Sequence, residues 1–132
     1  MIVHSSPYSL IKSELGTKTM QVTWLKQSIE LEEAQVISEI AKILDYVKGH
    51  SVVGIVVDAR NYPFRENDNI QHWINHTYMP QIIDQGVERY AIIVETEIKS
   101  VFENFIELDD AEDGIVVEYF TSIEEAQRWI ES

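Results

Sequence analysis

The chain has 132 residues, 45% of them hydrophobic and none of them cysteine, and its net charge at pH 7 is −13. That length and apolar content predict a single domain over residues 1–132, and the absence of cysteine excludes disulfides and cysteine-ligated metal sites. The N-terminus has no basic segment followed by an apolar stretch, and no segment approaches ~18 apolar residues, so we expect a cytoplasmic protein with neither a secretory signal nor a membrane span.

The acidic charge is concentrated in the second half of the chain. Residues 1–66 contain seven basic and eight acidic side chains, whereas residues 67–132 contain three basic and fifteen acidic ones. The second half would repel a phosphate backbone and no basic stripe offsets it, so we expect no nucleic acid or anionic membrane surface as a partner. The acidity favours either solubility alone or a basic protein partner.

Hydrophobic periodicity predicts five strands. Residues alternate between apolar and polar in Met20–Lys26, which indicates a half-buried strand that forms a hairpin with the strand before it. The runs Val52–Asp58 and Tyr90–Glu95 are nearly all apolar, which is typical of strands buried on both faces. In chain order, the predicted strands are Tyr8–Glu14, Met20–Lys26, Val52–Asp58, Tyr90–Glu95 and Ile115–Phe120.

Apolar spacings of three and four residues predict four helices. Their expected starts, in chain order, are Ile29, Asn67 or Asp68, Thr96 and Ser122. The first helix ends at Lys48, before Gly49. Pro80 kinks, ends or restarts the second helix. The last helix opens with Ser122 and Glu125, a pair whose spacing predicts a capping box.

The resulting order, ββαβαβαβα, predicts an α/β domain with a mixed, mainly parallel sheet of about five strands, an N-terminal hairpin and four helices. In open sheets of this kind, ligands bind outside the carboxyl ends of the parallel strands. Val52–Asp58 ends in polar residues at that edge, so we expect the binding site there. Exposed edges of the sheet would allow a homodimer.

The order and several residue patterns together resemble the STAS-like superfamily, which has the fold of sporulation anti-sigma-factor antagonists. The matching segments are Val56–Asn61, Trp73, Pro80 with Gly86 before Tyr90–Ile93, and Tyr119–Ile130, and the resemblance covers roughly residues 8–131. The chain is most similar to an uncharacterised bacterial branch, also described as CRAL-TRIO-like. The resemblance implies a non-catalytic domain that docks onto a protein or holds a small ligand.

The chain departs from that family at the residue that carries its signalling switch. The antagonists resemble one another in having Asp-x-Ser after the central strand, and a partner kinase phosphorylates this serine. Here Asp58 and Ala59 are followed by Arg60. The phosphoserine switch therefore does not carry over, because no phosphate charge can be added at this position.

The residues after the central strand are the first candidates for a binding site. The guanidinium of Arg60, with Asp58 and Asn61 beside it, could fix a small anionic or carboxylated ligand, or the three could hydrogen-bond to one another and anchor the strand end. Tyr62 and Phe64 lie in a proline-containing loop with no periodic reason to be buried, so we expect them to contact a ligand or partner.

Aromatic residues and two histidines supply the remaining candidates. Trp73 completes the expected docking face; with Trp24 and Tyr78 it could line a lipophilic pocket or pack in the core. His72 and His76 are four residues apart on a helix, which is the spacing of two metal ligands, with Asp68 as a candidate third. The alternative is two solvent-facing histidines, and we predict no bound metal.

Paired carboxylates at Glu95 and Glu97 could perform acid–base chemistry near Asp58. No nucleophile, oxyanion element or glycine-rich phosphate loop accompanies them in the sequence, so we predict neither catalytic residues nor a cofactor. The favoured function is a non-catalytic interaction or regulatory module that docks a protein partner through the loop after the central strand. The alternative is a carrier of a small apolar or amphiphilic ligand.

Overall fold

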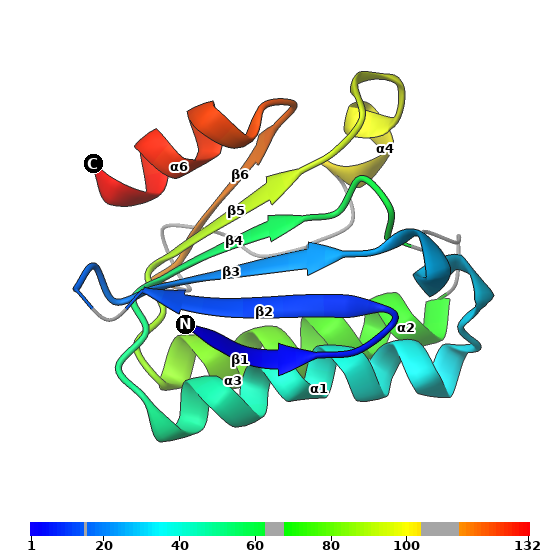
Figure 1. Ribbon diagram of the computed structural model, residues 1–132, viewed down its shortest axis with the longest axis horizontal. Coiled ribbons are helices and arrows are strands. Elements are labelled where there is room, and N and C mark those ends of the chain that lie inside the picture. The colour runs from blue at the N-terminus through cyan, green and yellow to red at the C-terminus, as the bar shows by residue number, and fades with distance from the viewer. Residues whose placement is uncertain (15, 63–67, 104–113) are drawn as a thin grey trace.

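The computed structural model describes residues 1–14, 16–62, 68–103 and 114–132. Its centre is a six-stranded sheet in which the strands lie side by side in chain order (Figure 1). The strands are β1 (Ile2–Ser5), β2 (Ser9–Glu14), β3 (Thr19–Trp24), β4 (Gly54–Asp58), β5 (Arg89–Ile93) and β6 (Val116–Phe120). Strands β1 to β3 are antiparallel and β3 to β6 are parallel. The predicted α/β class with a mixed, mainly parallel sheet is confirmed.

Strand β1 is a sixth strand that the sequence does not predict. It pairs with β2 at the edge of the sheet, in a register that places Ser5 opposite Leu10. Its four residues are too few to show an alternating pattern, and Ile2 is 58% exposed. The order of elements is therefore βββαβαβαβα rather than ββαβαβαβα.

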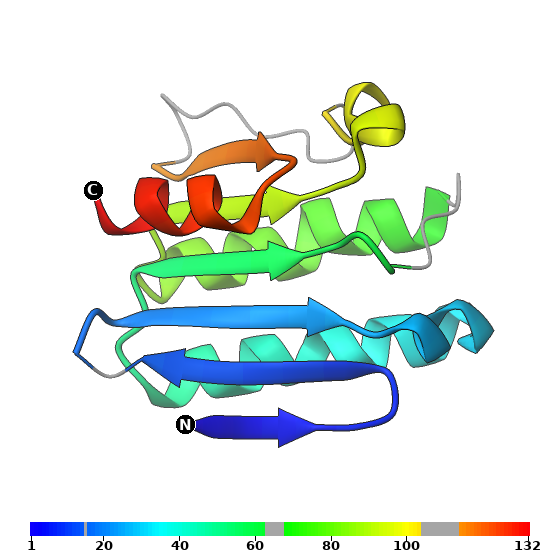
Figure 2. The same cartoon turned by 45° about the horizontal axis from the view of Figure 1, so that its top comes forward.

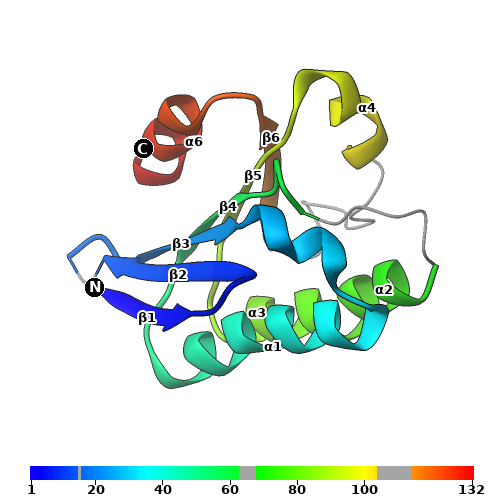
Figure 3. The same ribbon diagram turned by 45° about the vertical axis from the view of Figure 1, so that its right-hand side comes forward.

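Helices cover the two faces of the sheet unequally. They are η1 (Lys26–Glu30), α1 (Glu33–Gly49), α2 (Asp68–Trp73), η2 (Ile74–Tyr78), α3 (Met79–Asp84), η3 (Thr96–Ile98), α4 (Lys99–Phe102) and α6 (Ile123–Glu131). Helix α1 and the run from α2 to α3 lie together on one face, and α6 lies on the other (Figure 3). Helix α4 follows the carboxyl end of β5 (Figure 2).

The central strand β4 packs into a core on each side. Ile55 and Val57 belong to the larger core beneath α1, α2 and α3, whereas Val56 packs with Ala126 and Ile130 of α6. All five residues of β4 are buried, as the apolar run predicts. Complete burial of each aliphatic side chain contributes about 1.5–3 kcal/mol, so this strand couples the two helical layers.

The first predicted helix begins four residues later than its periodicity suggests. Helix α1 starts at Glu33 instead of Ile29, because the residues before it form the short 3-10 helix η1. Glu32 and Gln35 form a capping box that fixes this start. Ile29 is 72% exposed, so its apolar side chain is not part of the buried stripe of α1.

The second predicted helix is one run of helix with a π-turn, η2, between α2 and α3. Pro80 lies in the first turn of α3, where a missing N–H is tolerated, so it restarts the helix. The run ends at Gly86, whose φ of +103° is a conformation that glycine adopts readily. The amides of Gly86 and Val87 donate to the carbonyls of Ile83 and Ile82, the paired bonds of a Schellman motif.

Of the two remaining predicted helix starts, one is shifted by a residue and the other is confirmed. Glu95, rather than Thr96, occupies the N-cap position of η3. Ser122 caps α6 by accepting the amide of Glu125 at 3.4 Å, which is the first half of the predicted capping box. Its hydroxyl donates to the carboxylate of Glu124 at 2.8 Å.

The turn between β1 and β2 is attached to α1 by one carboxylate. Glu39 accepts hydrogen bonds from the hydroxyls of Ser6 at 2.7 Å and Ser9 at 2.9 Å, and His4 Nε2 lies 3.5 Å away. Burial acts to raise the pKa of Glu39, but these hydrogen bonds outweigh it and leave the pKa below its usual value. The edge of the sheet is thereby tied to the helical layer.

Gly54 allows α6 to approach β4 closely. A Cβ at this position would lie 2.7 Å from Cγ1 of Ile130, so Gly54→Ala must displace that side chain. We expect the free energy of unfolding to fall by about 1–3 kcal/mol, measured by urea denaturation. In an Ile130→Ala background the cost should be smaller, and an equal cost in both would contradict this packing. Gly49→Ala, with nothing within 4 Å, is the matched control and should not destabilise.

Candidate functional site

An apolar pocket lies between the sheet and its helices, toward the carboxyl ends of β3, β4 and β5. Its volume is about 50 Å³. It is lined by Trp24, Ile40, Ile43, Val57, Ala59, Tyr62, Ile74, Tyr78, Tyr90 and Ile92. An engineered apolar cavity of about 150 Å³ holds benzene, so the present pocket would hold a group of only a few atoms.

The pocket follows from the periodicity of the elements around it. Tyr90 and Ile92 are two residues apart on β5 and therefore share the face of the sheet that α1 covers. Ile40 and Ile43 are three apart on α1, so both can face the sheet. Each wall is thus one face of a regular element, which makes the pocket part of the main core.

Tyr62 lies where the pocket wall reaches the protein surface. Nine of the ten lining residues are buried, and Tyr62 is the partly exposed one. Its ring packs edge-on against Trp24 with centroids 5.0 Å apart, and its amide donates to the carbonyl of Ala59 at 3.1 Å. The carbonyl of Asn61 accepts from the hydroxyl of Ser28 at 2.7 Å. These contacts hold the start of the loop, Asn61 and Tyr62, beside the pocket.

Tyr78 and Tyr90 bring two hydroxyls into this apolar surrounding. Their oxygens are 3.1 Å apart, and the residues are 1% and 6% exposed. Burial raises the pKa of Tyr90 to about 12, and burial together with the neighbouring Tyr90 raises the pKa of Tyr78 well above its usual value. Trp73, which does not line the pocket, stacks on Tyr78 with ring centroids 6.0 Å apart. Both phenols are neutral at physiological pH.

Asp58 and Arg60 form a pair at the end of β4. Nε and Nη2 of Arg60 donate to the two carboxylate oxygens at 2.9 and 2.6 Å, and the backbone amide of Arg60 adds a bond of 3.2 Å. The hydrogen bonds and charge of Asp58 raise the pKa of Arg60. The structure thus shows the internal pair that the sequence left open, and a role for these residues in ligand binding stays a prediction.

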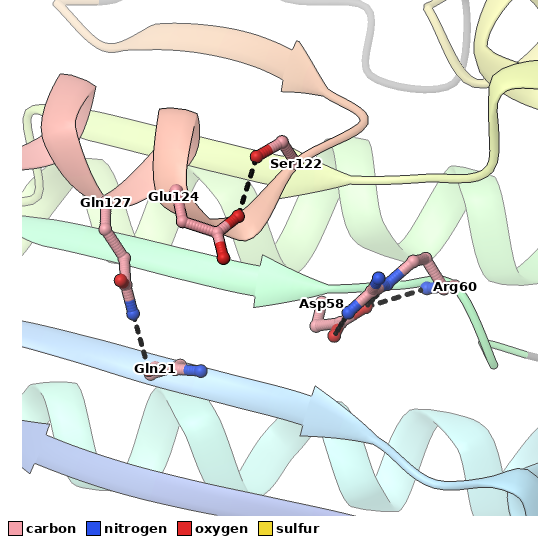
Figure 4. A network of polar contacts seen from close by, with 6 residues as sticks. All are labelled: Gln21, Asp58, Arg60, Ser122, Glu124 and Gln127. Carbon is pink, nitrogen blue, oxygen red and sulfur yellow. Dashed lines mark hydrogen bonds and ion pairs between the residues drawn. The ribbon is translucent and has the colours of Figure 1, made fainter.

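The pair lies on the face of the sheet opposite to the pocket. Val56 packs against α6, and Asp58, two residues later, points to the same side, beside the first turn of α6 and Glu124 (Figure 4). Val57 and Ala59 point to the pocket instead. Helix α6 is also tied to β3 on this face, where an amide of Gln127 donates to Gln21 at 3.4 Å.

The residues predicted to form one docking face are therefore divided between two. Tyr62 lines the pocket and Trp73 supports it from behind, whereas Asp58 and Arg60 belong to the α6 side. Asn61 is exposed, and its carbonyl is bound by the hydroxyl of Ser28. Phe64, the remaining candidate, lies outside the described residues.

His72 and His76 come together as a pair of exposed side chains, with ring centroids 4.2 Å apart. In the ranges of the chain that the structure describes, no group of three or more His, Cys, Asp or Glu side chains is placed to hold a metal ion. The two histidines are thus adjacent without a third ligand among those residues.

Tyr90 is the aromatic residue of the pocket wall that the sequence analysis does not identify as a candidate. The apolar run Tyr90–Glu95 accounts for it as part of a buried strand. A signal does exist: a tyrosine that begins a fully buried strand needs a partner for its hydroxyl, and Tyr78 occupies an inner position on the neighbouring helix.

Comparisons with models of protein families, with curated proteins and with solved structures find no match for this chain. The resemblance to the STAS-like superfamily therefore remains a prediction that rests on the residues quoted for it. None of the helices in the described ranges has the length and apolar character needed to cross a membrane.

Tyr78 and Tyr90 should ionise above the usual pH range of tyrosine, because folding buries both phenols. Because folding raises their pKa values, their contribution to stability is complete below about pH 10, the usual tyrosine value, and is lost as the pH rises toward 12. An ultraviolet absorbance titration should show one late-ionising group fewer in Tyr90→Phe than in the wild type. Identical absorbance changes at high pH in the two proteins would contradict the burial of the pair.

Proposed function

We propose that the protein is a non-catalytic, cytoplasmic binding domain whose pocket holds a small, largely apolar molecule. The composition of the pocket wall supports this: all ten lining residues are apolar or aromatic, and none of these ten carries a charged side chain. A concave apolar site with a few convergent polar groups is the usual form of a small-molecule site. The absence of cysteine suits the reducing cytoplasm.

The ionisation states of the nearby groups support a binding role rather than catalysis. A general acid or base works best with a pKa near the operating pH. The pKa of Tyr90 is about 12, and that of Tyr78 is also raised. Asp58, the nearest carboxylate along β4, is occupied by Arg60 on the other face of the sheet.

The volume of the pocket limits the ligand. About 50 Å³ accommodates a short aliphatic chain or the edge of a ring, and not a lipid. A larger ligand would have to displace the ring of Tyr62, the partly exposed residue of the wall. We therefore propose a ligand smaller than the lipid-sized molecule that a carrier would transport.

Xenon is a probe of suitable size, because it binds to small apolar cavities. Dissolved under pressure, it should shift the NMR methyl resonances of the lining isoleucines and valine and leave those of the α6 core unchanged. Ala59→Leu fills the pocket and should abolish the shifts, whereas Tyr62→Ala widens it and should admit toluene. Shifts spread over the whole protein, or none at the pocket, would contradict the proposal.

Docking of a basic protein is the second candidate, and the charge around the rim favours it. Glu95 and Glu97 are exposed where β5 ends, and Glu95 and Glu124 both act on Arg60. We call Glu95, Glu97 and Glu124 the acidic rim, which lies near the loop after β4 in a chain with a net charge of −13. This candidate retains the docking loop that the sequence predicts but gives its acidic neighbours the main role.

Charge reversal at the rim tests this second candidate. Glu95→Lys with Glu97→Lys should remove any salt-sensitive partner captured by the wild type, because the complementary potential is inverted. Glu14→Lys with Glu88→Lys makes the same change in charge at the opposite edge of the sheet and should keep that partner. Equal retention by both double variants, measured by affinity capture and quantitative mass spectrometry, would contradict docking at the rim.

A further inference from the structure

Two of the residues that line the pocket, Tyr78 and Tyr90, are hydrogen-bonded to each other through their hydroxyls. Tyr78 is the last residue of the π-turn η2, and Tyr90 belongs to β5, so the pair joins the helical layer to the sheet. Both residues line the pocket, and their hydroxyl oxygens are 3.1 Å apart. π-turns are rare and occur often at functional sites, because they change the direction in which a helix presents its side chains.

One of the two hydroxyl hydrogens of the Tyr78–Tyr90 pair has no acceptor among the described residues. Two phenols carry two hydroxyl hydrogens, and the bond between Tyr78 and Tyr90 uses one of them. Over the described ranges of the chain, neither hydroxyl has a second hydrogen-bond partner. A buried donor without an acceptor is costly, so an oxygen atom of a ligand placed here would satisfy it.

We propose that the pocket selects a small neutral molecule whose buried end carries an oxygen atom that accepts a hydrogen bond from the Tyr78–Tyr90 hydroxyl pair. Short aliphatic alcohols, ketones and esters belong to this class. This inference rests on the proposed function, since it names the class of ligand that the same pocket takes.

None of the ten lining residues is a cation that could bind a carboxylate, so we expect the pocket to discriminate against anions. A carboxylate entering the pocket would lose its hydration and meet no cation among the ten lining residues. Arg60 does not supply one, because its guanidinium is bound to Asp58 on the opposite face of the sheet. The two phenols stay neutral and can donate a hydrogen bond, but they cannot offset a buried charge. The pocket should therefore reject the anion that corresponds to each neutral ligand.

Three probes of similar size separate these contributions: ethane, methanol and formate. The protein used is the full chain, with dissociation constants from methyl and aromatic NMR titration at neutral pH. Wild type should bind ethane and methanol and should not bind formate. Tyr78→Phe/Tyr90→Phe removes both hydroxyls and should weaken methanol about fivefold, the effect of one net hydrogen bond. Its affinity for ethane should remain unchanged, which also shows that the pocket is intact.

Tyr46→Phe is the matched control. It removes a tyrosine hydroxyl that donates to Ser13 at 2.8 Å, away from the pocket lining, and should leave the affinity for methanol unchanged. A second readout needs no variant: the ¹³Cζ resonances of Tyr78 and Tyr90 report on their hydroxyl bonds. They should shift on saturation with methanol more than with ethane.

The outcomes distinguish this inference from the proposed function. If ethane fails to bind the wild type, the proposed function is wrong. If ethane binds but the double Phe variant binds methanol as well as the wild type does, the inference is overturned and the proposed function stands. Binding of formate as tight as that of methanol, or ¹³Cζ shifts that are equal for both neutral probes, would also overturn it.

Discussion

Strand β4 lies in the middle of the sheet with every side chain buried, so each residue must find a helical layer on the side to which the pleat directs it. Val56 packs against α6, and Val57 packs beneath α1. The alternation continues beyond the last apolar residue, so that Asp58 faces α6 and Ala59 faces the pocket. Neighbouring residues at the end of β4 therefore lie on different faces of the sheet, one charged and the other apolar.

The Asp58–Arg60 pair is a consequence of that constraint. Asp58 is 7% exposed, and a buried carboxylate deprived of its partner costs about 3–5 kcal/mol. The Arg60 side chain is 40% exposed, so solvent screens the pair and its net contribution lies nearer the ~0–1 kcal/mol of a surface ion pair. The two figures describe different changes: removing Arg60 is harmful, although forming the pair contributes little. Its main effect is to commit the guanidinium to Asp58.

The sequence predicts the layers of this fold better than it predicts the site. The runs at Val52–Asp58 and Tyr90–Glu95 indicate buried strands because both are apolar and flanked by polar residues, whereas β1 is too short to carry such a pattern. Closeness in sequence predicts one face for Asp58 and Tyr62, but the pleat and the turn after β4 direct them to opposite sides. The hydroxyl pair depends on the relative placement of a helix and a strand, which periodicity within each element does not contain.

The acidic surface and the neutral pocket act on different properties of a ligand. A net charge of −13 repels anions before they reach the rim, and the uncharged wall gives neither anions nor cations a partner inside. For neutral molecules, the remaining determinants are apolar area and the contact between Trp24 and Tyr62 at the entrance. An edge-on aromatic contact contributes about 0.5–1.5 kcal/mol. Burial of each further methylene contributes about 0.8 kcal/mol, so one or two methylenes offset the loss of that contact alone. The apolar area that the Tyr62 ring would expose adds to the cost of admitting a larger ligand.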